Sequence, residues 1–248
     1  MSRVASLLFS VVAYLVFFAT FLYLIAFVGD LPFVPVTVDR GPEAPVLVAI
    51  LANLALIALF GLQHSVMARQ SFKKAWTRVV PAQAERSVYV LAASLVLIAL
   101  FVGWRPIGGT VWSATGVAGP LLWGLFATGW LIVLLSTFLI NHFELFGLQQ
   151  AWFYARGRQA AAPQFRQPFL YKWVRHPLYS GFFLAFWATP HMSLGHLLLA
   201  VGMSAYMLIA IVHEERDLVA LFGADYEQYC ARVGKLTPRF KRQPAPPI

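Results

Sequence analysis

The chain has 248 residues, of which 60% are hydrophobic and only 12% are charged, and its mean hydropathy is +0.70. A soluble domain is about one quarter charged, so lipid must cover much of this surface. The formal net charge is +9, but the basic residues are confined to a few short segments, which argues against nucleic-acid binding. The single cysteine, Cys230, excludes an internal disulfide and a multi-thiolate metal site.

Five apolar stretches are long enough to enter a bilayer, whose core is crossed by about 20 apolar residues in a helix. They run approximately over 5–28, 44–67, 87–104, 119–140 and 177–212. The first is predicted to be a retained span, because it is long for a signal peptide and has no small-residue cleavage site. The fifth is too long for one crossing and contains Pro190, which predicts a helical hairpin. The expected fold is therefore all-α: a polytopic membrane bundle of four spans, a C-terminal helical hairpin and a cytoplasmic amphipathic helix over 213–229.

The positive charges predict the topology of this bundle. All Lys and Arg residues except Arg40 and Arg105 fall at the amino terminus, in 69–86, in 156–175, or from 216 onward. Short cytoplasmic loops collect positive charge, so both termini are expected to face the cytoplasm. No linker or repeat divides the sequence, and residues 1–248 are treated as one domain.

The first polar cluster at a membrane boundary reads Arg-His-Pro-Leu-Tyr at 175–179. Proline suits the first turn of a helix, which places Arg175 and His176 at the mouth of the hairpin and Tyr179 one turn inside. The free N–H groups of that turn, with Arg175, form a natural seat for a carboxylate. The alternative is that Arg175 only contributes to the positive charge of the cytoplasmic side, and that Tyr179 is only an aromatic residue at the membrane interface. Polar clusters at membrane depth favour the functional interpretation.

The other end of the hairpin carries Glu214 and Glu215. Adjacent residues point to different sides of a helix, so only one of these carboxylates faces inward with ease, where it could bind a cation or hydroxyl groups. The alternative is an ordinary solvated helix end. Tyr226 and Tyr229 follow at a spacing that puts them on one helix face.

Two further clusters end the second and fourth spans: Gln-His-Ser at 63–65, and Asn-His-Phe-Glu at 141–144, followed by Gln149 and Gln150. The charge argument places all four clusters at one membrane depth, as one shared polar pocket requires. A lone histidine at a helix end, such as His64, is more often structural than catalytic. No pair among the histidines of these clusters has ligand spacing on a helix, so no metal site is expected.

Residues 175–181, 214–218 and 222–229 together resemble the C-terminal signature of the isoprenylcysteine carboxyl methyltransferases. The sequences there are Arg-His-Pro-Leu-Tyr-Ser-Gly, Glu-Glu-Arg-Asp-Leu and Phe-Gly-Ala-Asp-Tyr-Glu-Gln-Tyr. The same signature is similar to that of membrane sterol reductases, which use NADPH.

Upstream motifs narrow the resemblance. Gln-His-Ser-Val-Met-Ala-Arg at 63–69, Glu-Arg-Ser-Val-Tyr-Val-Leu at 85–91 and the segment 141–152 look like those of bacterial methanethiol S-methyltransferases. That family lies in the membrane methyltransferase group that includes the NnrU-like proteins. The resemblance now covers most of the chain, with the cofactor region at about 141–240.

The resemblance implies S-adenosyl-L-methionine as methyl donor and a small apolar thiol as acceptor, with methanethiol giving dimethyl sulfide, in a bacterial inner membrane. Membrane lipid is the other expected partner. Arg175 and the helix start would hold the donor's carboxylate, beside His176 and Tyr179. Its ammonium or ribose hydroxyls would bind Glu214 or Glu215. The adenosine would contact Tyr226, Tyr229, Gln149 or Gln150.

A thiolate attacks far better than a thiol, so the site must remove or stabilise a proton. His142 and His64 are the candidate bases, with Glu144 as a possible orienter of His142, and Arg175 could instead stabilise the thiolate. Alternatives are a larger lipid-like thiol or carboxylate as acceptor, a reductase, or a non-catalytic transporter or accessory protein. A transporter would carry polar residues through the middle of its spans, whereas here they gather at one end.

Overall fold

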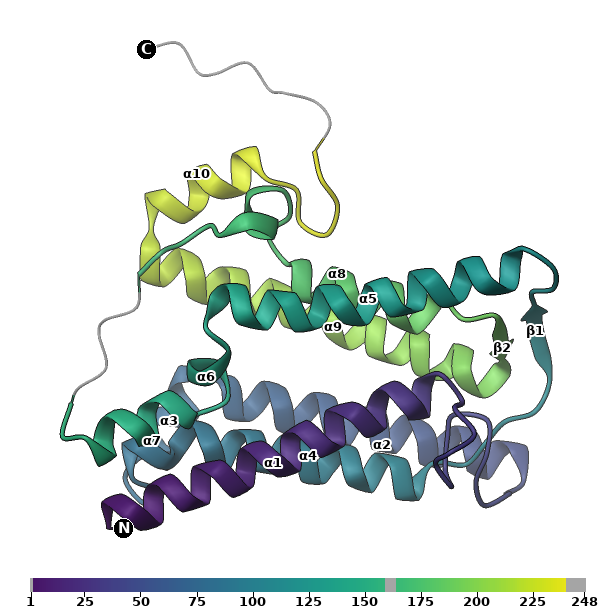
Figure 1. The fold of residues 1–248 in the computed structure, drawn as a ribbon, viewed down its shortest axis with the longest axis horizontal. Helices are drawn as coiled ribbons and strands as arrows, with labels where there is room; N and C mark the ends of the chain where they lie inside the picture. Colours follow the sequence, from purple (N-terminus) through teal and green to yellow (C-terminus); the bar gives the residue numbers. More distant parts are fainter. Residues whose placement is uncertain (1, 159–163, 240–248) are drawn as a thin grey trace.

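The computed structural model describes residues 2–158 and 164–239 and is a bundle of membrane-length helices (Figure 1). The candidate spans are α1 (Arg3–Val28), α2 (Val46–Ala68), α4 (Ala82–Gly103), α5 (Ala118–Ile140) and α9 (Leu194–Phe222). The shorter elements are α3 (Gln70–Trp76), α6 (His142–Leu145), α7 (Leu148–Ala155), α8 (Pro177–Trp187), α10 (Ala224–Arg232) and a 3-10 helix, η1 (Phe169–Lys172). The predicted all-α membrane bundle is confirmed. The expected cofactor region 141–240 includes residues 159–163 and 240, which lie outside the described residues.

The helices of the bundle form two layers, with α1, α2 and α4 in one and α5, α8 and α9 in the other (Figure 1). Helices α2 and α9 pack against each other and join the layers. The core between them is built from large side chains, among them Phe27, Trp104, Trp130, Phe186 and Leu199. Many Leu and Val side chains are exposed on the outside, as expected where lipid replaces water.

Helices α5 and α8 are held together by direct backbone contact. A Cβ atom added at Gly129 would lie 2.7 Å from the backbone nitrogen of Ala185, and one at Gly181 would lie 2.7 Å from the carbonyl oxygen of Gly129. Small residues let helices approach this closely in lipid, where dispersion and packing supply most of the association energy. This contact fixes the position of α8, whose first turn carries the Arg-His-Pro-Leu-Tyr motif.

The predicted hairpin is present, but its arms are unequal. Helix α8 has only 11 residues and ends before Pro190, whereas α9 has 29. Between them, β2 (His191–Ser193) pairs antiparallel with β1 (Thr110–Ser113), a small sheet that was not expected. The indole N–H of Trp112 also donates to the Thr189 carbonyl at 2.9 Å. A long-range pairing of this kind leaves no local signal in an apolar sequence.

Two predicted boundaries were wrong. The expected separate helix over 213–229 is divided, because residues up to Phe222 continue α9 and Gly223 (φ 55°) breaks the chain before α10. At 1.5 Å per residue α9 is about 43 Å long, more than the roughly 30 Å hydrocarbon core. The third span begins at Ala82 rather than 87, because 82–86 are good helix formers that hydropathy alone does not mark.

The start of α1 lies at the same end of the bundle as α10, α3, α6 and α7 (Figure 1). We call this the α10 end, and the opposite end the sheet end. All four polar clusters identified in the sequence belong to the α10 end.

We predict that Gly129→Ala destabilises the bundle by about 1–3 kcal/mol, because a Cβ there meets backbone atoms that cannot rotate away. Thermal unfolding in detergent measures the effect. Gly124→Ala on the same helix is the matched control, since nothing lies within 4 Å of a Cβ at that position. Equal melting temperatures for the two variants would contradict the close-packing account.

Candidate functional site

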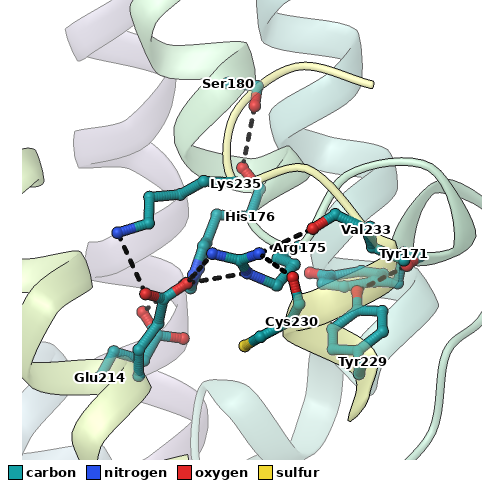
Figure 2. A network of polar contacts seen from close by, with 10 residues as sticks. Tyr171, Arg175, His176, Ser180, Glu214, Tyr229, Cys230, Val233 and Lys235 are labelled. Atoms are coloured by element: carbon teal, nitrogen blue, oxygen red, sulfur yellow. Dashed lines mark hydrogen bonds and ion pairs between the residues drawn. The ribbon is translucent and has the colours of Figure 1, made fainter. Parts of the chain in front are cut away.

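Arg175 is the centre of a buried polar network at the α10 end. Its side chain is 7% exposed, and its Nε and Nη2 atoms lie 2.9 and 2.8 Å from Oε1 of Glu215. Its Nη1 donates to the carbonyl oxygens of Cys230 at 3.0 Å and Val233 at 2.7 Å (Figure 2). Arg175 therefore ties the start of α8 to α9 and to the end of α10, and its donors already have protein partners.

Glu215 receives two more basic groups. His176 Nε2 lies 3.0 Å from Oε1 of Glu215, and Lys235 Nζ lies 3.1 Å from Oε2. We call Arg175, His176, Glu215 and Lys235 the Arg175 network. The segment after α10 is held beside it, since the backbone N–H groups of Arg175 and His176 donate to the carbonyls of Gly234 and Lys235.

The two adjacent carboxylates have different environments, as their positions on the helix predict. Glu215 points into the Arg175 network, while the Glu214 side chain is 45% exposed. Nδ1 of His176 lies 3.9 Å from Oε2 of Glu214, and the Tyr179 hydroxyl is next to the same carboxylate. Glu214 is thus an accessible carboxylate bordered by Tyr179 and His176.

His142 is fully engaged in hydrogen bonds. The Thr137 hydroxyl donates its only proton to the Leu134 carbonyl at 2.7 Å, so it accepts from Nδ1–H of His142 at 2.8 Å. The other ring nitrogen, Nε2, then accepts from the Tyr14 hydroxyl at 2.8 Å. The ring stacks on Phe138 at 4.2 Å, and burial lowers its pKa. His142 therefore joins α1, α5 and α6 as a neutral imidazole.

The polar residues after His142 belong to the same turn. The Glu144 carboxylate accepts from the side-chain amide of Asn141 at 2.9 Å. The hydrogen bonds that orient the His142 ring come from Thr137 and Tyr14, and not from the predicted Glu144. Gln149 is also bonded to Asn141. Gln150 donates to the Glu144 carbonyl, and its buried Oε1 has no hydrogen-bond partner in the part of the chain that the structure describes.

His64 has only one ring nitrogen engaged. Its Nε2 lies 2.7 Å from the Tyr89 hydroxyl, while its buried Nδ1 has no partner among the described residues. Arg86 lies over the Tyr89 ring, 5.1 Å from its centroid, and donates to the Leu145 carbonyl at 2.7 Å. The second span is thereby connected through α4 to the turn that carries His142.

Tyr226 and Tyr229 do share a face of α10, but that face is buried. Their exposed fractions are 2% and 3%, and both rings pack against Phe165. The Tyr229 hydroxyl donates to the Tyr171 carbonyl at 2.5 Å, and burial raises the pKa of Tyr229 to about 12. These rings form a small apolar core behind the Arg175 network and leave no open face for a base to stack on.

The structure thus brings together Arg175, His176, Tyr179, Glu214 and Glu215. The turn with His142, Glu144, Gln149 and Gln150 is a second group, and within residues 2–158 and 164–239 no hydrogen bond or ion pair joins it to the first.

Four residues at this end were not predicted: Arg86, Tyr89, Tyr206 and Lys235. Arg86 and Tyr89 stand at helical spacing within the motif at 85–91, which is a signal that could have identified them. Tyr206 lies inside an apolar run and Lys235 in a polar tail, so their placement depends on tertiary packing.

The sheet end carries different polar residues. Cavities of about 150 and 420 Å³ share Asp39 and His191 as lining residues. Asp39 accepts the Ser193 hydroxyl, and burial raises its pKa. None of the predicted site residues lines these cavities. Across the described ranges no cluster of three His, Cys, Asp or Glu side chains is placed to hold a metal ion.

Comparison with known proteins gives the family. The model of the NnrU protein family matches residues 52–241, which include every residue of the two groups above. The chain belongs to the NnrU family.

Several relatives in this comparison carry an enzyme's name. A methanethiol S-methyltransferase of Mycobacterium tuberculosis is 48% identical and is matched over 96% of this chain and 98% of its own length. Methanethiol S-methyltransferase 2 of Bradyrhizobium diazoefficiens is 50% identical over 96% and 92%. Nurim of Xenopus laevis is 30% identical over 65% and 59%. No solved structure matches the chain.

We predict that Glu215→Gln destabilises the protein by about 3–5 kcal/mol, because it leaves the buried Arg175 guanidinium without its counter-ion. The melting temperature in detergent should fall clearly below that of Glu227→Gln, a control on the exposed side of α10. A Glu215→Gln melting temperature equal to that of the wild type would show that the network is not structural.

Proposed function

We propose that this methyltransferase transfers a methyl group from S-adenosyl-L-methionine to a small thiol, converting methanethiol to dimethyl sulfide. The near full-length similarity to proteins named methanethiol S-methyltransferase carries the proposal. The grouping of titratable side chains at one end of an otherwise apolar bundle supports it. From the distribution of positive charge we place this α10 end, with both termini, on the cytoplasmic side of a bacterial inner membrane.

The residues around Glu214 fit the donor. Its accessible carboxylate suits an ammonium group or ribose hydroxyls, and Tyr179 and His176 lie beside it. Lys235 is 42% exposed, whereas Arg175 is committed to protein partners, so we assign the donor's carboxylate to Lys235 and the first turn of α8. Oε1 of Gln150, which no described residue engages, offers an acceptor to adenosine. When bound, S-adenosyl-L-methionine supplies an electrophilic methyl group on a sulfonium.

The other predicted residues take supporting roles in this proposal. Arg175 and Glu215 hold α8, α9 and α10 in a fixed relation, and Tyr226 and Tyr229 pack behind them. Methyl transfer to sulfur is an in-line displacement, so such alignment supplies much of the acceleration. His142 positions α6 through Thr137 and Tyr14, because neither of its nitrogens is free to accept a proton.

The reaction is tested with purified protein in detergent, S-adenosyl-L-methionine and methanethiol, with gas chromatography of the headspace. We expect dimethyl sulfide to form with one equivalent of S-adenosylhomocysteine. Absence of product from folded protein that binds the donor would reject methanethiol as the acceptor.

We predict that Glu214→Gln raises the Kd for S-adenosyl-L-methionine about 10-fold or more, since a hydrogen bond to a charged group contributes about 1.5–3 kcal/mol. Isothermal titration calorimetry measures the change. Asp225→Asn, at an exposed position of α10, should bind the donor as the wild type does. Unchanged affinity in Glu214→Gln would place the donor elsewhere.

A further inference from the structure

Beside the donor site lies an aromatic cluster of Phe60, His64, Tyr89 and Tyr206, which we call the His64 cluster. We propose that the acceptor thiol binds in the His64 cluster and gives its proton to Nδ1 of His64. This inference rests on the proposed function, which assigns contacts to the donor but no binding site to the thiol.

The His64 imidazole is enclosed by aromatic rings. It stacks on Phe60 with ring centroids 5.2 Å apart and meets Tyr206 edge-on at 6.2 Å. Phe60 and Tyr206 also meet edge-on, at 5.6 Å. Sulfur makes favourable contacts with aromatic rings at about 5 Å, so these surroundings suit a short alkanethiol better than a polar acceptor.

Nδ1 of His64 is the feature that requires a ligand. Buried polar atoms almost always have a hydrogen-bond partner, and the described residues supply none for this nitrogen. The Tyr89 hydroxyl lies 2.7 Å from Nε2 and can also donate to the His64 carbonyl at 3.5 Å. With Nε2–H donating to Tyr89, Nδ1 carries a lone pair. We assign this tautomer by analogy with backbone groups. Among them, a buried donor without an acceptor is rarer than a buried acceptor without a donor.

The His64 cluster and the donor site share helix α9. Tyr206, which meets His64 edge-on, stands about two turns before Glu214 on α9, and α9 packs against α2, which carries His64. A thiol on His64 and a donor on Glu214 would therefore occupy neighbouring positions at the α10 end, as a direct transfer between them needs.

The chemistry balances without a further reactant. The S–H bond of the thiol breaks, its proton goes to Nδ1 of His64, and the electron pair stays on sulfur. That sulfur forms the new S–CH₃ bond while the bond between the methyl group and the donor's sulfonium breaks, and the latter pair remains on the donor. The imidazolium formed on His64 keeps its Nε2–H on Tyr89.

Tyr206 sets the size of the acceptor. Its ring lies directly on α2, because a Cβ added at Gly61 would be 2.9 Å from Cδ2 of Tyr206. Together with Phe60 it fills the space next to His64 that a longer alkyl chain would need. This favours a one-carbon thiol over the larger lipid-like acceptors.

The proton-transfer test is His64→Gln, with His191→Gln at the sheet end as the matched control. Loss of a general base costs about 10²–10⁴-fold in rate, so we expect kcat/KM for methanethiol to fall at least ~100-fold at neutral pH. The loss should shrink as the pH approaches the thiol's own pKa, because the free thiolate needs no base.

The titratable and charged groups that face His64 from neighbouring helices are Arg86 and Tyr89 on α4, and Tyr206 on α9. They are unchanged in His64→Gln, so a difference in pH profile from the wild type reports on His64. A loss of kcat/KM that is equally large at every pH would overturn the role of His64 as base. An unaltered kcat/KM in His64→Gln would overturn the acceptor site.

The size test is Tyr206→Leu, with Tyr206→Phe as the control that keeps the ring. One methylene in an apolar pocket is worth about 10–200-fold in selectivity. We therefore expect the ratio of kcat/KM for butanethiol to that for methanethiol to rise at least ~10-fold in Tyr206→Leu and to stay unchanged in Tyr206→Phe.

Binding without the donor gives an independent measurement. Calorimetric titration of butanethiol should show tighter binding to Tyr206→Leu than to the wild type or Tyr206→Phe. Equal affinities for all three proteins would overturn the acceptor site. Failure of the proposed function is distinguishable, since the wild type itself would then methylate no thiol.

Discussion

The structure of the α10 end depends on one carboxylate, Glu215, shared by three basic side chains. Arg175, His176 and Lys235 come from the start of α8 and from the segment after α10, while Glu215 stands on α9. A buried guanidinium cannot be left unpaired without a large cost, so these elements are fixed relative to one another. Because Glu215 occupies the basic groups, its neighbour Glu214 is left accessible, and the proposed donor site follows from this division of roles.

The bilayer explains why these polar groups gather at one end. Along the middle of the bundle, large aromatic side chains and the glycine contact of α5 with α8 fill the interior. Unpaired polar groups are expensive there, whereas at the α10 end they have partners or ligands. In the proposed function, an apolar thiol enters the bundle from the lipid and a charged donor reaches it from water, so that both meet at this boundary.

Two histidines at helix ends illustrate what sequence can and cannot decide. His64 and His142 look alike as candidates, since each follows an apolar span. They differ through partners that no local pattern reveals: Tyr14 is 128 residues from His142, and Tyr89 is 25 residues from His64. Apolar length and Pro190 were enough to predict the bundle and its hairpin, and the polar motifs were enough to predict that Arg175 and Glu214 lie at the same end of it. The β1–β2 pairing, the position of Tyr206 and the lack of a partner for Nδ1 of His64 among the described residues arise only from tertiary packing.

The most direct test of the central claim is an experimental structure of the protein with S-adenosylhomocysteine bound. The claim is that Glu215 orders a donor site that opens beside His64. The account predicts the amino-acid part of the ligand at Glu214 and Lys235, with its sulfur directed toward His64 and the Glu215 contacts retained. A ligand with its sulfur directed toward His142, or one bound in the cavities at the sheet end, would contradict it.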